Sequence, residues 1–69
     1  MKIKYFPETD TALIEFSEQA VSETKEISED IYVDMDDAGR LVSMTIEHAR
    51  TSARIKEFSF LEVAETSAA

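Results

Sequence analysis

The chain has 69 residues, of which 43% are hydrophobic and 32% charged, and its formal net charge at pH 7 is −8. This length gives room for one hydrophobic core and no second domain. The absence of cysteine excludes disulfides, thiolate metal ligands and cysteine nucleophiles. The negative charge disfavours direct binding to nucleic acid, because a polyanion is repelled by it. No apolar run is long enough for a membrane span or a signal peptide, so we expect a cytoplasmic protein that does not enter membranes.

The first part of the chain is predicted to form a hairpin. Residues Lys2 to Phe6 alternate polar and apolar side chains with the period of a strand, and Thr11 to Phe16 resumes the pattern. Pro7 to Asp10 between them has turn chemistry, because proline fixes φ and the aspartate side chain can close a turn. Glu23 to Ile27 is predicted to be at most a short, exposed strand.

A second hairpin is the strongest structural prediction. Residues 31–36 and 42–46 place apolar side chains at every second position, which predicts two strands with one buried face each. Gly39 lies between them and can take a positive φ in a tight turn. A register slip of one residue would expose the whole apolar set, so burial fixes the pairing.

The periodicity changes after Ile46. Residues 49–56 are good helix formers, and Ser59 to Glu62 has the spacing of a capping box at a helix start. We therefore expect one helix, or two short helices, to cover the sheet. The last five residues, 65–69, are expected to be a frayed tail.

These elements predict an α+β fold, an antiparallel β-meander of four to five short strands with one or two C-terminal helices packed on it. The predicted single domain spans residues 1–64. A small core and exposed sheet edges would also favour a homodimer. The residues predicted to face inward are Ile3, Tyr5, Ile14, Phe16, Ile31, Val33, Val42, Met44, Ile46, Ile55, Phe58 and Leu61.

The order of several short motifs resembles a known family. These motifs are Tyr5–Asp10, Glu23–Glu26, Ile31–Asp34 and Asp36–Val42. Together they are similar to the small bacterial and phage domain of unknown function 2283, over roughly the first fifty residues. The resemblance implies a small antiparallel sheet with C-terminal helical cover and no established enzymatic activity. It supplies no functional residues, and the chain departs from the family pattern at Phe6, Ala12 and Ser43.

Negative charge is concentrated in one segment. Between Glu8 and Asp37 the sequence has 11 acids and one base, Lys25, which gives a net charge of −10. One interpretation is that these carboxylates only keep the protein soluble. The other is that they imitate a row of phosphates and bind the basic groove of a nucleic-acid-handling protein. The residues predicted to contact such a partner are Glu8, Asp10, Glu15, Glu23, Glu26, Glu29, Asp30, Asp34, Asp36 and Asp37.

Catalytic and metal-binding motifs are incomplete in this sequence. The segment from Asp34 to Gly39 begins like a calcium loop, but Ala38 and Thr45 stand where ligands are required. The single histidine, His48, has no second histidine to share a metal site or to activate a serine. One glycine cannot form a glycine-rich phosphate cradle.

The sequence therefore predicts a non-enzymatic protein without a cofactor or metal. We expect it to neutralise a basic, nucleic-acid-handling protein in the manner of an antitoxin or of a phage-borne anti-defence or anti-CRISPR inhibitor. The alternative is a structural or small-ligand homodimeric domain whose acidity is incidental.

Overall fold

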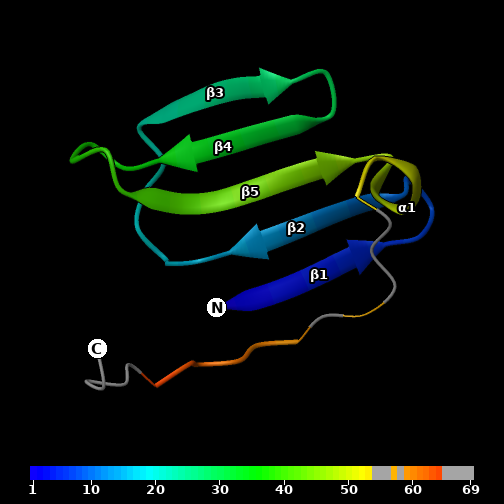
Figure 1. Cartoon of the computed structure of the whole chain (residues 1–69). Helices are drawn as coiled ribbons and strands as arrows, with labels where there is room; N and C mark the ends of the chain where they lie inside the picture. The colour runs from blue at the N-terminus through cyan, green and yellow to red at the C-terminus, as the bar shows by residue number, and fades with distance from the viewer. Residues whose placement is uncertain (54–56, 58, 65–69) are drawn as a thin grey trace.

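The computed structural model in Figure 1 describes residues 1–53, 57 and 59–64 of the chain. Five strands form one antiparallel sheet and one short helix follows them, which confirms the predicted α+β class. In the described ranges no helix is long and apolar enough to cross a membrane. The elements are β1 (Lys2–Phe6), β2 (Thr11–Glu15), β3 (Glu23–Ser28), β4 (Ile31–Met35), β5 (Leu41–Glu47) and α1 (Ala49–Ser52).

The strand order in the sheet is β1-β2-β5-β4-β3. Both predicted hairpins are present, β1 with β2 and β4 with β5, and the exposed strand β3 pairs with β4. Pairing between β2 and β5 joins the first hairpin to the meander of β3, β4 and β5. The segment between β2 and β3 therefore crosses from one unit to the other (Figure 1).

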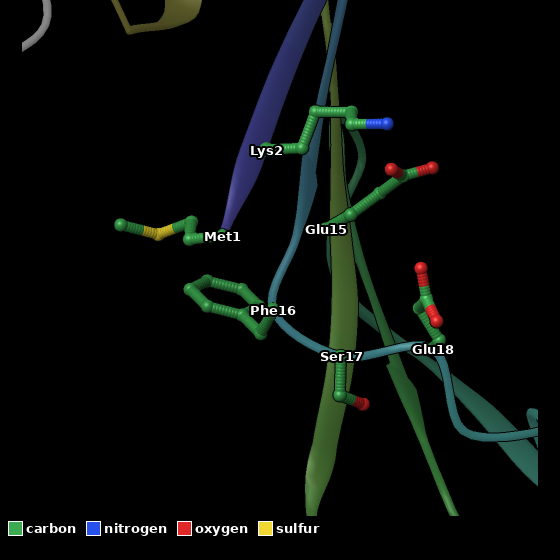
Figure 2. Close-up of a pocket in the computed structure, with 6 residues that line it drawn as sticks. All are labelled: Met1, Lys2, Glu15, Phe16, Ser17 and Glu18. Atoms are coloured by element: carbon green, nitrogen blue, oxygen red, sulfur yellow. The ribbon is translucent and has the colours of Figure 1, made fainter.

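The register of the strands gives the sheet two chemically different faces, because directly paired residues point to the same side. Figure 2 shows the division at one end of β1 and β2, where Met1 and Phe16 extend to one side and Lys2 and Glu15 to the other. We call one side the apolar face; it carries Ile3, Tyr5, Ala12, Ile14, Ile31, Val33, Met44 and Ile46. The opposite, polar face carries Lys2, Lys4, Leu13, Glu15, Glu26, Tyr32, Asp34, Thr45 and Glu47.

The core lies where α1 meets one end of the apolar face. Ala12 and Ala49 are fully buried there and Ile46 is 7% exposed. The small side chains of Ala12 and Ala49 allow the first turn of α1 to lie against β2 and β5. Three half-buried residues pack around this cluster: Tyr5, Ile14 and Met44.

Most of the residues predicted to face inward do so only partly. Val42 and Ile46 are buried, whereas six others are half-buried: Ile3, Tyr5, Ile14, Ile31, Val33 and Met44. Phe16 lies just past the end of β2 and points to the apolar side but is 37% exposed (Figure 2). The prediction was wrong for Leu61, which is 81% exposed. Ile55 and Phe58 lie outside the described residues.

The prediction of a helix that begins at Ser59 was also wrong, since residues 59–62 are not helical and Phe60 is 74% exposed. A capping box stabilises a helix start only locally, and a short helix needs an apolar face packed on the fold to persist. The helix predicted over residues 49–56 is present as α1, which ends at Ser52. Residues 54–56 and the predicted frayed tail, 65–69, lie outside the described residues.

Candidate functional site

An acidic cluster surrounds Tyr32 on the polar face. Tyr32 lies on β4 directly opposite Glu26 of β3, and its partner on β5 is Thr45, two positions before Glu47. The turn between β3 and β4 adds Glu29 and Asp30. The pKa of Tyr32 is raised, first by the charge of Glu47, then by partial burial and by the other three carboxylates. The four charged side chains that raise this pKa are all carboxylates, and one of them, Asp30, also pairs with His48.

Positive charge on the polar face lies at the opposite edge of the sheet. Lys2 and Lys4 lie on the edge strand β1, and the Nζ atom of Lys4 is 3.5 Å from Oε1 of Glu15 on β2. Glu15 is therefore neutralised by its own protein. The polar face thus changes from positive at β1 to negative at β3 and β4.

Asp34 lies on the polar face next to the acidic cluster, but both its oxygens already accept hydrogen bonds. The hydroxyl of Thr24 donates to Oδ1 at 2.5 Å and that of Ser43 donates to Oδ2 at 2.6 Å. These three residues form one row across β3, β4 and β5. Asp34 therefore ties the strands together and has little capacity left for a partner.

Asp36 closes the turn between β4 and β5. Its carboxylate is 8% exposed and its Oδ1 accepts from the backbone amides of Ala38 at 2.9 Å and Arg40 at 2.8 Å. The Arg40 amide, followed by that of Ala38 and the Arg40 charge, lowers the pKa of Asp36. Gly39 takes the predicted positive φ, 79°, in this turn. Asp36 is therefore occupied by the backbone of its own turn.

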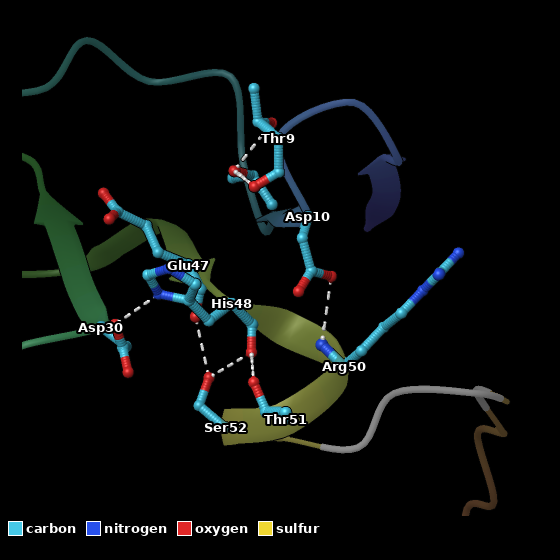
Figure 3. A network of polar contacts seen from close by, with 9 residues as sticks. Thr9, Asp10, Asp30, Glu47, His48, Arg50, Thr51 and Ser52 are labelled. Carbon is cyan, nitrogen blue, oxygen red and sulfur yellow. Dashed lines mark hydrogen bonds and ion pairs between the residues drawn. The ribbon is translucent and has the colours of Figure 1, made fainter.

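Asp10 anchors α1 to the first hairpin (Figure 3). Its Oδ1 accepts from the phenol of Tyr5 at 2.6 Å and from the amide of Arg50 at 3.2 Å, while its carbonyl accepts from the amide of Ala49 at 2.9 Å. The hydrogen bond from Tyr5 is the main reason that the pKa of Asp10 is lowered. The Arg50 guanidinium also lies 5.4 Å from the centre of the Tyr5 ring. Asp10 thus supplies the helix cap that His48, the local N-cap, does not provide.

His48 pairs with Asp30 at the end of β5. The two atoms, Nδ1 of the imidazole and Oδ1 of the carboxylate, are 3.0 Å apart (Figure 3). The hydrogen bond and the charge of Asp30 raise the pKa of His48. His48 has a φ of 52°, a left-handed conformation that lets the chain turn sharply from β5 into α1.

Stability is expected to fall as pH rises through the raised pKa of His48. Below the ordinary histidine pKa, about 6.5, the charged imidazole makes its full contribution to the stability of the folded state. This contribution is lost as the pH rises above the pKa that His48 has in the folded state. Thermal unfolding between about pH 5.5 and about pH 8.5 should show a falling midpoint for the natural protein. The variant His48→Asn, whose side chain tolerates a positive φ, should lose this pH dependence. Equal pH dependence in both proteins would contradict the assignment.

A family comparison places the chain among known sequences. The sequence model of the family described as protein of unknown function (DUF2283) matches residues 2–50, which include all five strands and the start of α1. The chain belongs to the DUF2283 family. No curated protein and no solved structure matches it. The resemblance expected from the sequence motifs is therefore confirmed, and the family description assigns no activity.

Within this DUF2283 fold, the structure separates the carboxylates that were predicted to contact one partner. Three of them lie in the acidic cluster, Glu26, Glu29 and Asp30, and Asp30 also pairs with His48. Three others hold the fold through hydrogen bonds: Asp10, Asp34 and Asp36. Glu15 is paired with Lys4.

The last three of these carboxylates are exposed at separate places: Glu8, Glu23 and Asp37. Glu8 lies in the turn between β1 and β2, whereas Asp37 lies in the turn between β4 and β5, at the opposite end of the sheet (Figure 1). Glu23 is paired with Met35 and so points to the apolar side of β3. The structure thus reduces the predicted partner-binding surface to the smaller acidic cluster around Tyr32.

Two members of the site were missed from the sequence, because neither Tyr32 nor Glu47 was among the residues predicted to contact a partner. The period-two pattern held the necessary signal, because Thr45 and Glu47 share one side of β5 and Tyr32 pairs with Thr45. The tight hairpin between β4 and β5 fixes this neighbourhood.

Proposed function

We propose that this protein binds a basic protein through the acidic cluster formed by Glu26, Glu29, Asp30 and Glu47 around Tyr32. The single observation that supports this function is that strand pairing places Glu26 directly opposite Tyr32 and Glu47 on the same face, two positions beyond its partner Thr45. The negative field of these carboxylates speeds the approach of a positively charged partner and makes binding sensitive to salt. The role is that of a cytoplasmic, non-enzymatic inhibitor that occupies the nucleic-acid-binding groove of its partner.

The geometry of the sheet supports recognition of arginine and lysine. Neighbouring strands lie about 4.8 Å apart, so carboxylates on β3 and β5 flank Tyr32 at fixed separations. The half-buried Tyr32 ring adds an aromatic surface, and arginine packs favourably on such rings. Tyrosine and arginine are enriched in protein interfaces for this reason.

Neutralising the cluster should weaken binding selectively. The variant Glu26→Gln/Glu29→Gln/Glu47→Gln removes three negative charges and leaves the Asp30–His48 pair intact. Its matched control, Glu8→Gln/Glu18→Gln/Asp37→Asn, removes the same charge from exposed residues elsewhere. With an oligoarginine peptide as the probe, we expect at least about a tenfold loss of affinity and a smaller salt dependence in the cluster variant only.

The same pair of variants tests the biological partner. Tagged natural protein should capture a basic protein from lysate of its own host, the cluster variant should not, and added double-stranded DNA or RNA should compete with the capture. Equal loss in the cluster variant and its control would show that net charge alone acts, and would overturn the proposed site. Capture that nucleic acid does not displace would overturn the groove-occupying role.

A further inference from the structure

The apolar face is largely uncovered in the part of the chain that the structure describes. The buried apolar residues there are Ala12, Val42, Ile46 and Ala49, and no large side chain is fully buried. Ile3, Ile14, Val33 and Met44 point to this face and are only half-buried. A sheet with one apolar face is stable only when a second layer covers that face.

The size of this face shows what could cover it. Five strands spaced about 4.8 Å apart and five residues long make a face of roughly 24 by 17 Å, or about 400 Å² in projection. The four residues of α1 span only about 6 Å at one end of it. An extended segment of the length of the described residues 59–64 is only about one strand wide. Their exposed side chains, Phe60, Leu61 and Val63, are not packed on the face.

The distribution of charge permits a second copy to approach this side. Among the strands, the charged side chains on the apolar face are Glu23 and Lys25 of the edge strand β3, which have opposite signs. Beside Tyr5 at one end of this face lie Asp10 and Arg50, which also have opposite signs. The acidic cluster lies on the polar face and in the turn beside it. Four of the five acidic side chains of the strands, Glu15, Glu26, Asp34 and Glu47, therefore point away from the apolar face.

We propose that two copies of this chain pack apolar face to apolar face and form a two-layer sandwich. The two sheets would lie about 10 Å apart, with Ile14, Val33 and Met44 of each copy in the shared core. Two faces of about 400 Å² in projection total about 800 Å², below the roughly 1,200–2,000 Å² of stable interfaces, which indicates a weak, reversible dimer with a dissociation constant of about micromolar size or larger. Both acidic clusters stay on the outside, so this proposal stands independently of the proposed function.

Sedimentation velocity on the full chain tests the dimer. From about 1 µM to about 500 µM the natural protein should shift from monomer to dimer, and its thermal midpoint should rise with concentration. Ile14→Glu places a charge on the apolar face and should raise the protein concentration at which half of the chains are dimeric by at least about tenfold. Leu13→Glu adds the same charge one residue away, on the polar face beside Lys4, and should leave this concentration unchanged. A monomer at every concentration, or equal effects of the two variants, would overturn the proposal.

Single cysteines test the geometry even if Ile14→Glu fails to fold. The chain contains no natural cysteine, and Met44 lies at the middle of the central strand β5. Oxidation should crosslink Met44→Cys into a dimer far faster than Thr45→Cys, whose side chain is on the outer face. Phe60→Ser should leave dimerisation unchanged. Equal crosslinking rates would place the interface elsewhere, and a dimer strengthened by Phe60→Ser would identify the C-terminal segment as the natural cover; either result overturns the proposal.

Discussion

Replacing Ile46 with alanine is expected to destabilise the protein more than any other single truncation. Ile46 is 7% exposed, lies on the central strand β5 and pairs with Ala12 on one side and Ile31 on the other. Removing a buried isoleucine side chain to Cβ costs about 2–5 kcal/mol, because the surrounding residues do not fill the cavity. Small domains of this size have a free energy of unfolding of only about 5 kcal/mol. We therefore expect Ile46→Ala to retain only about 0–3 kcal/mol and to unfold at a much lower urea concentration than the natural protein.

Urea unfolding followed by far-UV circular dichroism measures this effect. The matched control is Ile27→Ala on β3, where the same side chain is 61% exposed. The control should change the free energy of unfolding by less than about 0.5 kcal/mol. Equal losses in the two variants would show that Ile46 is not part of the core described here.

Enlarging Ala12 to leucine is expected to separate α1 from the sheet. Ala12 has no exposed surface and packs beneath Ala49, the first residue of α1. Three more carbon atoms at this position have no space, and overpacking of this kind costs about 1–3 kcal/mol. Because Asp10 and the amides of Ala49 and Arg50 hold α1 at the same place, these hydrogen bonds should weaken as well.

Two measurements check this expectation. Urea unfolding should show the loss of stability, and hydrogen exchange should show faster exchange at the amides of Ala49 and Arg50. Ala20→Leu in the exposed segment between β2 and β3 is the control and should change neither quantity. Unchanged exchange at those amides in Ala12→Leu would mean that α1 does not depend on the small side chain at this position.

The strands and the two tight hairpins could be predicted because their signals are local. Alternation of period two and the turn residues around Pro7 and Gly39 act within ten residues of sequence. The pairing of β2 with β5 is not a local property, since it joins Ile14 to Met44, which are separated in the sequence by β3 and β4. A capping box at Ser59 is local too, but tertiary contacts decide whether a helix forms there.

The sequence predicted that the candidate site is acidic, but it did not predict which residues form it. The sequence shows a dense run of carboxylates, yet alternate residues of a strand point to opposite faces, so Glu23 and Glu26 separate. Hydrogen bonding removes further carboxylates from the surface, as for Asp36 in its turn. Whether a carboxylate accepts hydrogen bonds from its own turn depends on the backbone geometry of that turn, which composition does not reveal. Glu47 enters the cluster only through the pairing of β5 with β4.

The change of sign across the polar face gives the molecule an electric dipole that lies in the plane of the sheet. Its positive pole is the edge strand β1, with Lys2 and Lys4, and its negative pole lies toward β3 and the turn that follows it. A cationic body approaching from solution turns the molecule before contact, so that β3 leads and β1 trails. Encounters are therefore oriented at distances where no side chain yet touches.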